Sequence, residues 1–453
     1  MNFDHNAQIN TAWLKGSLGA SFLPERNSLD VNEKHYDAIV IGAGLAGTST
    51  AYALAEKGKR VLVIEKQDAP GKGGSGNPQG ALYNKFSTEF NIQTKYALSN
   101  LLFSQTYYQY LQERQDLQEH QSQPDERFWS NCGLIQVAWN EKELKKQTEL
   151  LEKNDYPEEL LKQLTPKQAS KVAGVHIDHG GLFFSNSGWV APKKLCQLLL
   201  KHPLITTHYN TEVSHLKHDE AEGLWAVYGT RENLINTTNN VVVCSASDAK
   251  SLSQLSHLRT KPIRGQVSLL STNTLNDAKL RDLKTVLCGE GYISPEHNGQ
   301  FCFGATFDLK NQKCDVIESD HTHNINQLTS WFTAAKNSIN SDCLPLLKGR
   351  TSLRCTSSDY IPIIGKAPVY EKQIEQFAKL RQDAKYNFDC EGIYHEGLFV
   401  NIAHGSKGLS SCPMAAKFIA SQICNEAPPF TEDILKILSP SRFLIRGLIR
   451  GKV

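Results

Sequence analysis

The sequence predicts an α/β protein in which a nucleotide-binding βαβ domain is joined to a second α+β domain built on an antiparallel sheet. Three observations support this fold class. Residues 36–66, YDAIVIGAGLAGTSTAYALAEKGKRVLVIEK, suit a strand, a glycine turn, a helix and a second strand. After residue 262 the pattern changes to longer β-like runs. The 453 residues exceed the length at which one hydrophobic core keeps growing, so two lobes are expected.

The first stretch carries glycines where a dinucleotide needs them. Gly42, Gly44 and Gly47 stand in G-x-G-x-x-G order between the apolar run AIVI and the helix. The first permits a tight turn, the second lets the backbone approach a pyrophosphate, and the third allows close packing of helix on strand. Leu45 and Ala46 begin the helix, whose N-terminal N–H groups face the anion. The pattern predicts a Rossmann-like nucleotide site.

The acid that ends the second strand narrows the choice of nucleotide ligand. Glu65, followed by Lys66, would accept a hydrogen bond from a ribose hydroxyl, and its charge disfavours a 2′-phosphate, so NAD or FAD is expected before NADP. The glycine spacing recurs within residues 71–76, but no strand precedes it there. The uncharged run 38–55 could also be a membrane helix or a signal peptide, and its glycines and Thr-Ser-Thr run disfavour both.

Bulk composition excludes few functions. The chain is 40% hydrophobic and 21% charged with a mean hydropathy of −0.40, so we expect a cytoplasmic protein without a membrane segment. Eleven cysteines without a C-x-x-C pair predict neither a disulfide framework nor a zinc site. The histidine clusters 176–179 and 320–323 lack further ligands at suitable spacing, so no metal is predicted.

Hydrophobic periodicity places the other elements. Helices are expected over 92–114, 141–153, 157–171, 324–338 and 409–424, strands over 128–139, 266–270, 292–307 and 397–402, and a three-stranded meander over 212–243. Small residues after the last meander strand, including Ala246, would let the backbone approach a ligand.

The expected organisation is an extension 1–35, a discontinuous cofactor-binding domain of residues 36–84, 190–260 and 350–424, a substrate domain of residues 85–189 and 261–349, and a basic tail 425–453. The last residues, SRFLIRGLIRGKV, carry four cations and no acid. They suit either a short amphipathic helix packed on the body or a basic surface for phosphates or a membrane, and the sequence favours neither.

Longer motifs carry a family resemblance. YDAIVIGAGLAG with Glu65, a meander ending in VVVCSAS and a late strand, turn and helix resemble the D-amino-acid oxidase family of FAD-dependent amine oxidoreductases. GGSGNPQGALYNKF at 73–86 and LRCTSSDYIPIIG at 353–365 are similar to motifs of the FAD-dependent C-terminal domain of bifunctional tRNA 5-methylaminomethyl-2-thiouridine biosynthesis proteins. That family also carries a methyltransferase domain ahead of the flavoprotein part, and the roughly 35 residues here are too few for one.

The resemblance implies an activity. Bound FAD would serve the oxidative removal of the carboxymethyl group from 5-carboxymethylaminomethyl(-2-thio)uridine at the tRNA wobble position, leaving the aminomethyl nucleoside and glyoxylate. Any methylation would need a separate methyltransferase. Arg354 would bind the substrate carboxylate with two parallel hydrogen bonds, as the family's arginine at that place does. The plain alternative for Arg354 is a surface arginine or an ion pair with the nearby Asp359.

The same resemblance places further residues around the flavin. Lys407 would add positive charge at the pyrimidine edge, where negative charge develops on reduction, although a solvated side chain is the simpler interpretation. His404 is expected to be a packed loop residue. Val213 would contact the adenine through its backbone, with strand core as the alternative. The remaining expected contacts are Ser75, Gly76, Asn77, Gln79 and Gly80 over the isoalloxazine, and Gly405, Ser406, Gly408 and Leu409 in the turn before the last helix.

Phosphate contacts to tRNA are expected from the tail arginines and from Lys193 and Lys194, with a solvated face as the alternative for the two lysines. Two other functions remain open on the sequence. An oxidase or dehydrogenase of a small free amino acid, of the glycine or sarcosine type, would use the same arginine and flavin. A non-catalytic flavin-fold module that binds tRNA is the second alternative.

Overall fold

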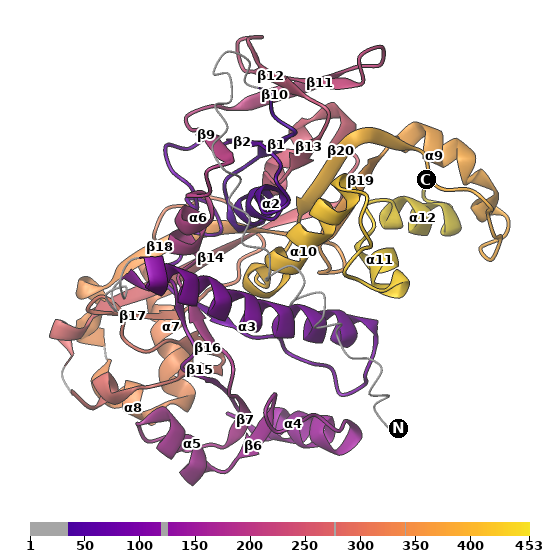
Figure 1. Ribbon diagram of the computed structural model, residues 1–453. Coiled ribbons are helices and arrows are strands. Elements are labelled where there is room, and N and C mark those ends of the chain that lie inside the picture. The colour runs from indigo at the N-terminus through magenta and orange to yellow at the C-terminus, as the bar shows by residue number, and fades with distance from the viewer. Residues whose placement is uncertain (1–34, 119–125, 276–277, 340) are drawn as a thin grey trace.

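A computed structural model describes residues 35–118, 126–275, 278–339 and 341–453 (Figure 1). A six-stranded sheet has the order β19-β20-β13-β1-β2-β9, and an eight-stranded sheet has the order β18-β14-β17-β16-β15-β5-β7-β6. Two three-stranded sheets, β3-β8-β4 and β10-β11-β12, complete the β structure of the described ranges. Nearly all of the predicted extension 1–35 lies outside the described residues.

The six-stranded sheet forms around β1 (Ala38–Ile41), which pairs in parallel with β2 (Val61–Ile64) and β13 (Val241–Val243). All residues of these three strands are buried, as a parallel sheet covered on both faces requires. The outer strands are β9 (Ile205–His208), β20 (Tyr394–Ile402) and β19 (Ile363–Pro368), of which only β19 runs antiparallel to its neighbour.

Helices α2 (Leu45–Ala55) and α10 (Gly408–Ile423) pack on this sheet, and α3 (Ile92–Gln118) and α6 (Pro192–Leu199) pack on these two helices. The predicted βαβ unit is confirmed, with α2 as its helix. α10 packs against α2 and against the long helix α3, and α6 packs on the other side of α2 (Figure 1).

The eight-stranded sheet belongs to the second lobe. Its longest pair is β14 (Thr260–Ser271) with β18 (Lys348–Ser357), antiparallel from Thr260 opposite Ser357 to Leu269 opposite Lys348. Residues 350–357, which the sequence placed in the cofactor-binding domain, therefore pair with this sheet. The other strands are β17 (Gln300–Gly304), β16 (Gly291–Ile293), β15 (Val286–Gly289), β5 (Leu134–Val137), β7 (Gly181–Phe184) and β6 (Lys162–Leu164).

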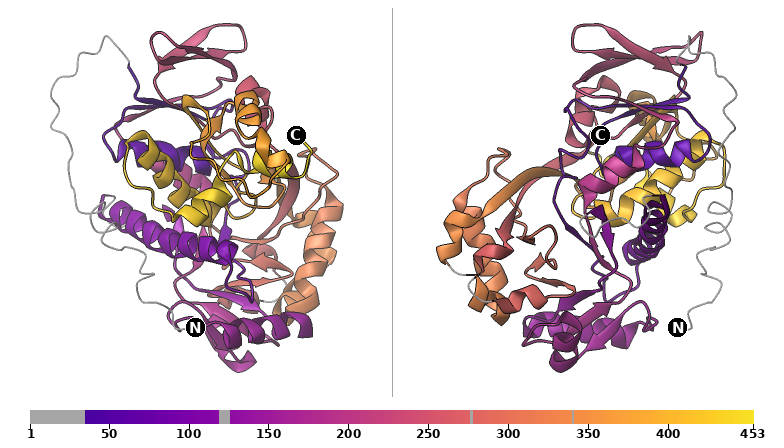
Figure 2. Two further views of the ribbon diagram at one scale, coloured as in Figure 1. Left: turned by 90° about the vertical axis from the view of Figure 1, so that its right-hand side faces the viewer. Right: turned by 60° about the vertical axis from the view of Figure 1, so that its left-hand side comes forward.

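Figure 2 shows the lobes from two further sides, with the orange strand β18 leading from the second lobe toward the first. The remaining helices are α4 (Glu141–Lys153), α5 (Pro166–Ala173), α7 (Glu318–Trp331), α8 (Thr333–Ser338), α9 (Tyr370–Gln376), α11 (Glu432–Leu438) and α12 (Arg442–Ile449). The small sheets contain β3 (Gly80–Leu82), β8 (Gly188–Val190), β4 (Trp129–Ser130), β10 (Val213–Asp219), β11 (Leu224–Gly229) and β12 (Leu234–Thr238).

Several predicted elements were wrong in detail, each for a local reason. The single strand 128–139 is two strands in different sheets, because Gly133 turns the chain with φ +76°. The helix 157–171 is β6 followed by α5, which starts only where Thr165 and Gln168 form a capping box. The meander ends with β12, whereas the VVV run pairs with β1 instead.

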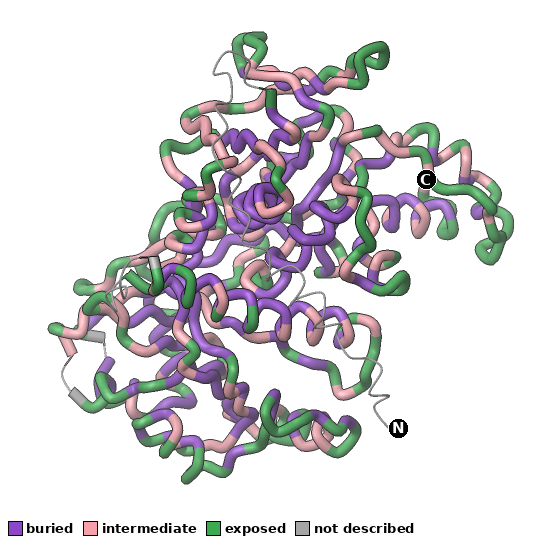
Figure 3. The backbone as a smooth tube through the Cα atoms, in the orientation of Figure 1, coloured by how far each residue is buried: buried purple, intermediate pink, exposed green. Residues whose placement is uncertain are grey.

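Burial follows the sheets and the helices between them. Figure 3 shows the buried backbone running through α2 and its surrounding strands, with exposed residues at the loops of the periphery.

The predicted helix 324–338 is longer than expected and is broken in two: α7 begins at Glu318, and α8 follows after Phe332.

The C-terminal helix α12 is held by a buried arginine. Arg442, 5% exposed, donates from Nε and Nη2 to both carboxylate oxygens of Asp359 at 3.1 and 3.0 Å, and from Nη2 to the Ile361 carbonyl at 2.6 Å. Arg446 donates to the same carboxylate at 2.5 Å. Burial raises the pKa of Asp359, but the hydrogen bonds and charge of Arg442 outweigh it and hold the pKa at about 2. The packing interpretation of the tail is therefore correct for its first two cations.

We expect Arg442→Met to lower the free energy of unfolding by about 3 kcal/mol, because the Asp359 carboxylate loses both hydrogen bonds from a buried guanidinium and three backbone carbonyls lose its N–H donors. The measurement is chemical unfolding of the full chain with FAD present. Arg450→Met, an exposed change at the opposite, C-terminal end of α12, should stay within about 0.5 kcal/mol of the parent. Equal stability of the two variants would contradict the structural role of Arg442.

Candidate functional site

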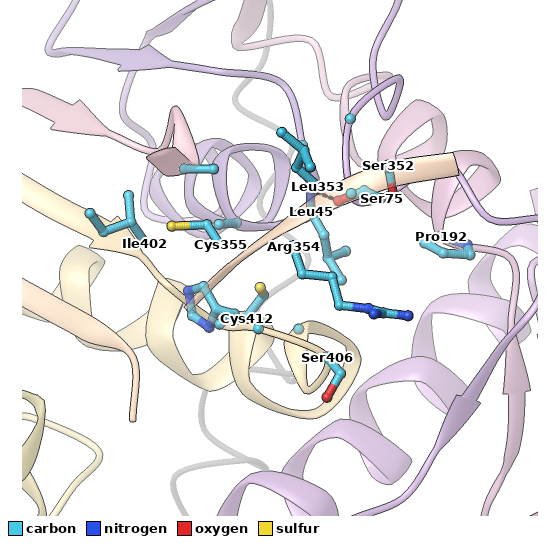
Figure 4. A pocket seen from close by; sticks show the side chains of 18 of the residues that line it. Leu45, Ser75, Pro192, Ser352, Leu353, Arg354, Cys355, Ile402, Ser406 and Cys412 are labelled. Atoms are coloured by element: carbon cyan, nitrogen blue, oxygen red, sulfur yellow. Dashed lines mark hydrogen bonds between the residues drawn. The ribbon is translucent and has the colours of Figure 1, made fainter. Parts of the chain in front are cut away.

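A cavity of about 940 Å³ lies between the two lobes. Its walls come from the glycine turn after β1, the end of β2, the loop 72–80, strand β18 and the turn before α10. Figure 4 shows Arg354 extending from β18 into this space, with Ser75, Ser406 and Pro192 around it. The volume lies at the upper end of the range of roughly 300–1,000 Å³ that small-molecule and cofactor sites occupy.

The glycine turn is tightly constrained. Gly42 has φ +103°, a conformation that side chains disfavour. A Cβ on Gly47 would lie 1.8 Å from the Gly42 carbonyl oxygen, so the helix can approach the strand only with glycine there. Gly42, Gly44, Leu45 and Ala46 line the cavity, whereas Gly47 lies behind the turn and not on the cavity wall.

Glu65 is fixed at the end of β2 by backbone donors. Its Oε2 accepts from the Ala43 N–H at 2.6 Å and its Oε1 from the Gln67 N–H at 2.9 Å. Lys66 pairs with Asp248 beside it. Val213 and Ala246 line the same end of the cavity. A carboxylate held in this way is aimed by the main chain, which suits recognition of a neutral hydroxyl pair.

The loop 72–80 is held by an arginine that sequence reasoning missed. Arg350 on β18 donates from Nη1 to Asn77 Oδ1 and from Nη2 to the Lys72 carbonyl, both at 2.9 Å. A Cβ on Gly76 would lie 2.3 Å from Arg350 Nη2, so the glycine makes room for the guanidinium. Burial lowers the pKa of Arg350. Its only sequence signal is its place three residues before the LRCTSSDY motif.

Not every predicted loop residue faces the cavity. Ser75, Asn77 and Gly80 do, and Ser75 Oγ accepts from the Leu45 N–H at 2.9 Å, which ties the loop to the start of α2. Gly76 and Gln79 do not line it. The Gln79 carbonyl instead accepts from the hydroxyl of Tyr292 at 3.0 Å, and Tyr292 lines the cavity although the sequence did not single it out.

The turn before α10 is attached to β18. The Gly405 N–H donates to the Cys355 carbonyl at 2.7 Å, and the backbone of His404 forms an isolated antiparallel β-bridge with Thr356. Pro413 inside α10 has no N–H for the Leu409 carbonyl, and the Tyr108 hydroxyl of α3 donates to that carbonyl at 2.5 Å instead. Gly405, Ser406, Lys407, Gly408 and Leu409 all line the cavity.

Two cations face the cavity without an acid among the residues that the structure describes. Arg354 donates from Nη1 to the Thr306 carbonyl at 3.0 Å, and burial lowers its pKa. The alternative of an ion pair with Asp359 is wrong, because that carboxylate binds Arg442. Lys407 has no side-chain hydrogen bond or ion pair in the described ranges, and desolvation at the cavity wall lowers its pKa although the residue is partly open to solvent.

Unusual backbone conformations gather at the cavity. Ala246, Ala305 and Ala403 have φ values of +54°, +149° and +65°, and all three line it. Such conformations persist only where surrounding structure enforces them, and they are typical of functional sites. The sequence gives no signal for them, because alanine is usually found at negative φ.

His404 lines the cavity and is held by a polar network. Its Nε2 lies 2.8 Å from Asn401 Oδ1 and its Nδ1 lies 2.8 Å from Ser411 Oγ, and Asn401 Nδ2 donates to Thr50 Oγ1 at 3.0 Å. Burial lowers the pKa of His404 to about 3, so the ring is neutral at pH 7. The prediction that His404 is a packed loop residue agrees with this network.

Within the described ranges no group of three or more His, Cys, Asp and Glu side chains is arranged to hold a metal ion. The described helices also include none with the length and apolar character needed to cross a membrane.

The depressed pKa of His404 predicts a pH effect on stability. The unfolded chain binds a proton at this histidine below about pH 6.5 and the folded chain only below about pH 3, so the stabilisation is complete above pH 6.5 and is lost as pH falls. From pH 7 to pH 5 this group should cost about 2 kcal/mol. Thermal unfolding of His404→Asn at fixed FAD concentration should therefore depend less on pH than that of the parent, while the exposed change His323→Asn should leave the dependence unaltered. Identical pH dependence of His404→Asn and parent would exclude the effect.

Known proteins match this chain over most of its length. A family model for FAD-dependent oxidoreductases (DAO) matches residues 37–422. The chain is 37% identical over 417 residues to the tRNA 5-methylaminomethyl-2-thiouridine biosynthesis bifunctional protein of Chromohalobacter salexigens, which covers 91% of this chain and 57% of that protein. The protein of the same name from Chromobacterium violaceum is 35% identical over 416 residues, 92% of this chain and 60% of its own length. The chain thus spans less than two thirds of these relatives.

Solved structures show the same fold at low identity. Glycine oxidase from Geobacillus kaustophilus superposes with a TM-score of 0.71 at 18% identity, covering 90% of this chain and 99% of that one. Iminodiacetate oxidase from Chelativorans sp. BNC1 gives a TM-score of 0.67 at 19% identity, covering 89% and 98%. The predicted fold class is confirmed. Because the family model spans residues 37–422, this chain belongs to the family of FAD-dependent oxidoreductases.

Proposed function

We propose that this enzyme oxidatively removes the carboxymethyl group from 5-carboxymethylaminomethyl(-2-thio)uridine at the wobble position of tRNA, giving 5-aminomethyl(-2-thio)uridine and glyoxylate. The observation that carries the proposal is Arg354, a largely desolvated cation at the cavity with no carboxylate of its own. The relatives, named for tRNA 5-methylaminomethyl-2-thiouridine biosynthesis, support the nucleoside as the substrate.

The cavity fits FAD by its own geometry. The Gly42 turn and the N–H groups at the start of α2 suit the pyrophosphate, and the carboxylate of Glu65, aimed by two backbone N–H groups, suits the ribose hydroxyls. We assign the loop residues Ser75 and Asn77 and the turn 405–409 to the isoalloxazine end. When bound, FAD supplies a two-electron acceptor for a C–H bond next to nitrogen.

The protein's own groups would bind and orient the substrate. Arg354 would hold the carboxylate of the N–CH₂–COO⁻ unit, which fixes the methylene between nitrogen and carboxylate. Loss of two electrons and a proton from that carbon gives a C=N bond. Water then adds to the carbon, the C–N bond breaks, and the amine and glyoxylate leave.

Lys407 is proposed to stabilise negative charge. It lies at the cavity in the turn before α10, and its ammonium has no acid partner in the described structure. Its lowered pKa arises from desolvation, and an anion beside it would offset that cost. The charge would be most useful where the reaction builds negative charge on the cofactor.

The proposed partner is tRNA, which places the reaction in the cytoplasm. The structure reassigns part of the predicted phosphate contact, since Arg442 is buried on Asp359 and Lys194 lies 3.4 Å from a ring nitrogen of His297. Lys193, Arg450 and Lys452 are exposed and remain candidates for phosphates. We further propose that any subsequent methylation is carried out by a methyltransferase outside the region matched here.

A second candidate is oxidation of a small free amino acid. The similar structures are named glycine oxidase and iminodiacetate oxidase, and iminodiacetate carries the same N–CH₂–COO⁻ unit as the proposed nucleoside. Arg354 would serve either substrate, so the two functions differ in what lies beyond the nitrogen.

The direct test incubates the holoenzyme with tRNA that carries the carboxymethylaminomethyl group and analyses the nucleosides by mass spectrometry. We expect conversion to the aminomethyl nucleoside together with glyoxylate. Parallel reactions receive glycine, sarcosine or iminodiacetate at millimolar concentration. Efficient turnover of these compounds without change in the tRNA would reject the proposal in favour of the second candidate.

Arg354→Ala should raise the KM for the modified tRNA by about 100-fold, because two charge-assisted hydrogen bonds to the carboxylate are lost. FAD content, read from visible absorbance, should stay at the parent level. Arg354→Lys keeps the positive charge but lacks the planar pair of donors, so its KM should lie between those of the parent and Arg354→Ala. A parent-like KM in Arg354→Ala would remove this residue from substrate binding.

A further inference from the structure

Arg354 lies against a glycine on the neighbouring strand. Gly265 on β14 pairs with Ser352 of β18, two residues before Arg354, so Gly265 and Arg354 share one face of the sheet as diagonal neighbours. A Cβ built on Gly265 would lie 2.4 Å from Nη1, 2.5 Å from Cζ and 2.6 Å from Nη2 of Arg354. Ordinary van der Waals contact starts at 3.4 Å. The guanidinium therefore occupies the place that a side chain at 265 would take.

The backbone does not require glycine at this position. Gly265 is not among the described glycines with positive φ, and its neighbours on both sides continue the β14–β18 ladder. Glycine inside a strand weakens it by about 0.5–1 kcal/mol relative to alanine and often marks a close approach of another group. The approaching group here is the Arg354 guanidinium.

A carbonyl fixes the other side of the guanidinium. Nη1 of Arg354 donates to the Thr306 carbonyl at 3.0 Å. That carbonyl follows Gly304 and Ala305, which have φ values of +80° and +149°, and the Thr306 hydroxyl accepts from the Gln266 N–H at 2.9 Å. No hydrogen bond from Nε or Nη2 to another described residue is recorded. The Nε and Nη2 edge is the side-on pair of donors that a carboxylate can accept in parallel.

We propose that Gly265 is a positioning residue for substrate binding. By lacking a side chain it lets the guanidinium lie flat against β14, with Nη1 on the Thr306 carbonyl and the Nε and Nη2 edge presented to the substrate carboxylate. This inference rests on the proposed function, in which Arg354 binds that carboxylate. It adds that residue 265 sets how closely the Arg354 guanidinium approaches β14, and that this position determines the affinity for the carboxylate.

The test measures carboxylate binding separately from turnover. Glycolate is titrated into the oxidised holoenzyme and followed by the change in flavin visible absorbance. In Gly265→Ala the methyl group displaces the guanidinium by about 1 Å, and we expect the dissociation constant of glycolate to rise about 10- to 100-fold through the weakened charge-assisted hydrogen bonds. FAD content and the absorbance spectrum without glycolate should match the parent. Lys261→Ala, an exposed change on the same strand, should leave glycolate binding unaltered.

A double-mutant cycle separates positioning from a general structural effect. If Gly265 acts through Arg354, adding Gly265→Ala to Arg354→Ala should change glycolate affinity by less than about twofold. The KM for the modified tRNA should follow the same non-additive pattern. Independent, additive losses in the two variants, or parent-like binding by Gly265→Ala, would overturn the inference while leaving the role of Arg354 intact.

Other outcomes are equally decisive. Parent-like glycolate binding by Arg354→Ala would overturn both the carboxylate-binding role in the proposed function and this inference. If Gly265→Ala alone yields no holoenzyme, the double variant decides, because truncating Arg354 removes the three atoms that the new methyl group would meet. Recovery of FAD-loaded protein in the double variant supports the contact, and failure to recover overturns it.

Discussion

The site depends on one hydrogen bond between the lobes, from the Gly405 N–H to the Cys355 carbonyl at 2.7 Å. Cys355 belongs to β18 of the eight-stranded sheet, and Gly405 belongs to the turn that follows β20 of the six-stranded sheet. Arg354 is adjacent to one partner and Lys407 is two residues from the other. Together with the β-bridge between Thr356 and His404, the bond holds the two segments that carry the cavity cations next to each other. The loop held by Arg350 completes the same junction from the opposite side.

Two buried arginines, Arg264 and Arg442, show why the partly buried Arg354 is distinctive. Arg264, 0% exposed, meets Asp320 and the carbonyls of Lys313 and Asp315, and Arg442 meets Asp359. Both charges are thus compensated within the fold, as buried charges must be. Arg354 has only a carbonyl, so part of its desolvation remains uncompensated until an anion arrives. This uncompensated desolvation of Arg354 lowers the stability of the fold, and it favours binding of a carboxylate.

The sequence predicts what is local. The Gly42 turn, Glu65 and the buried runs around them follow from spacing and polarity, and the structure places them at one cavity. Arg350 and Tyr292 could not be found in this way, because their roles arise from pairing between segments far apart in the chain. The same non-local pairing places residues 350–357 in the second sheet. Positive φ at Ala305 is likewise imposed by its surroundings and leaves no mark in composition.

The order of strands in the six-stranded sheet has a consequence for how the protein is made. β1 lies between β2, which follows it closely in the chain, and β13, which is about 200 residues later. The other neighbour of β13 is β20, which ends near residue 400. On the ribosome, an apolar strand at the start of the sheet has only one neighbour until most of the chain has emerged. Such distant contacts are slow to form, and the exposed edge of β1 can pair with other chains meanwhile. Chaperone protection of the nascent chain would thus matter most for the strand that later forms the cofactor turn.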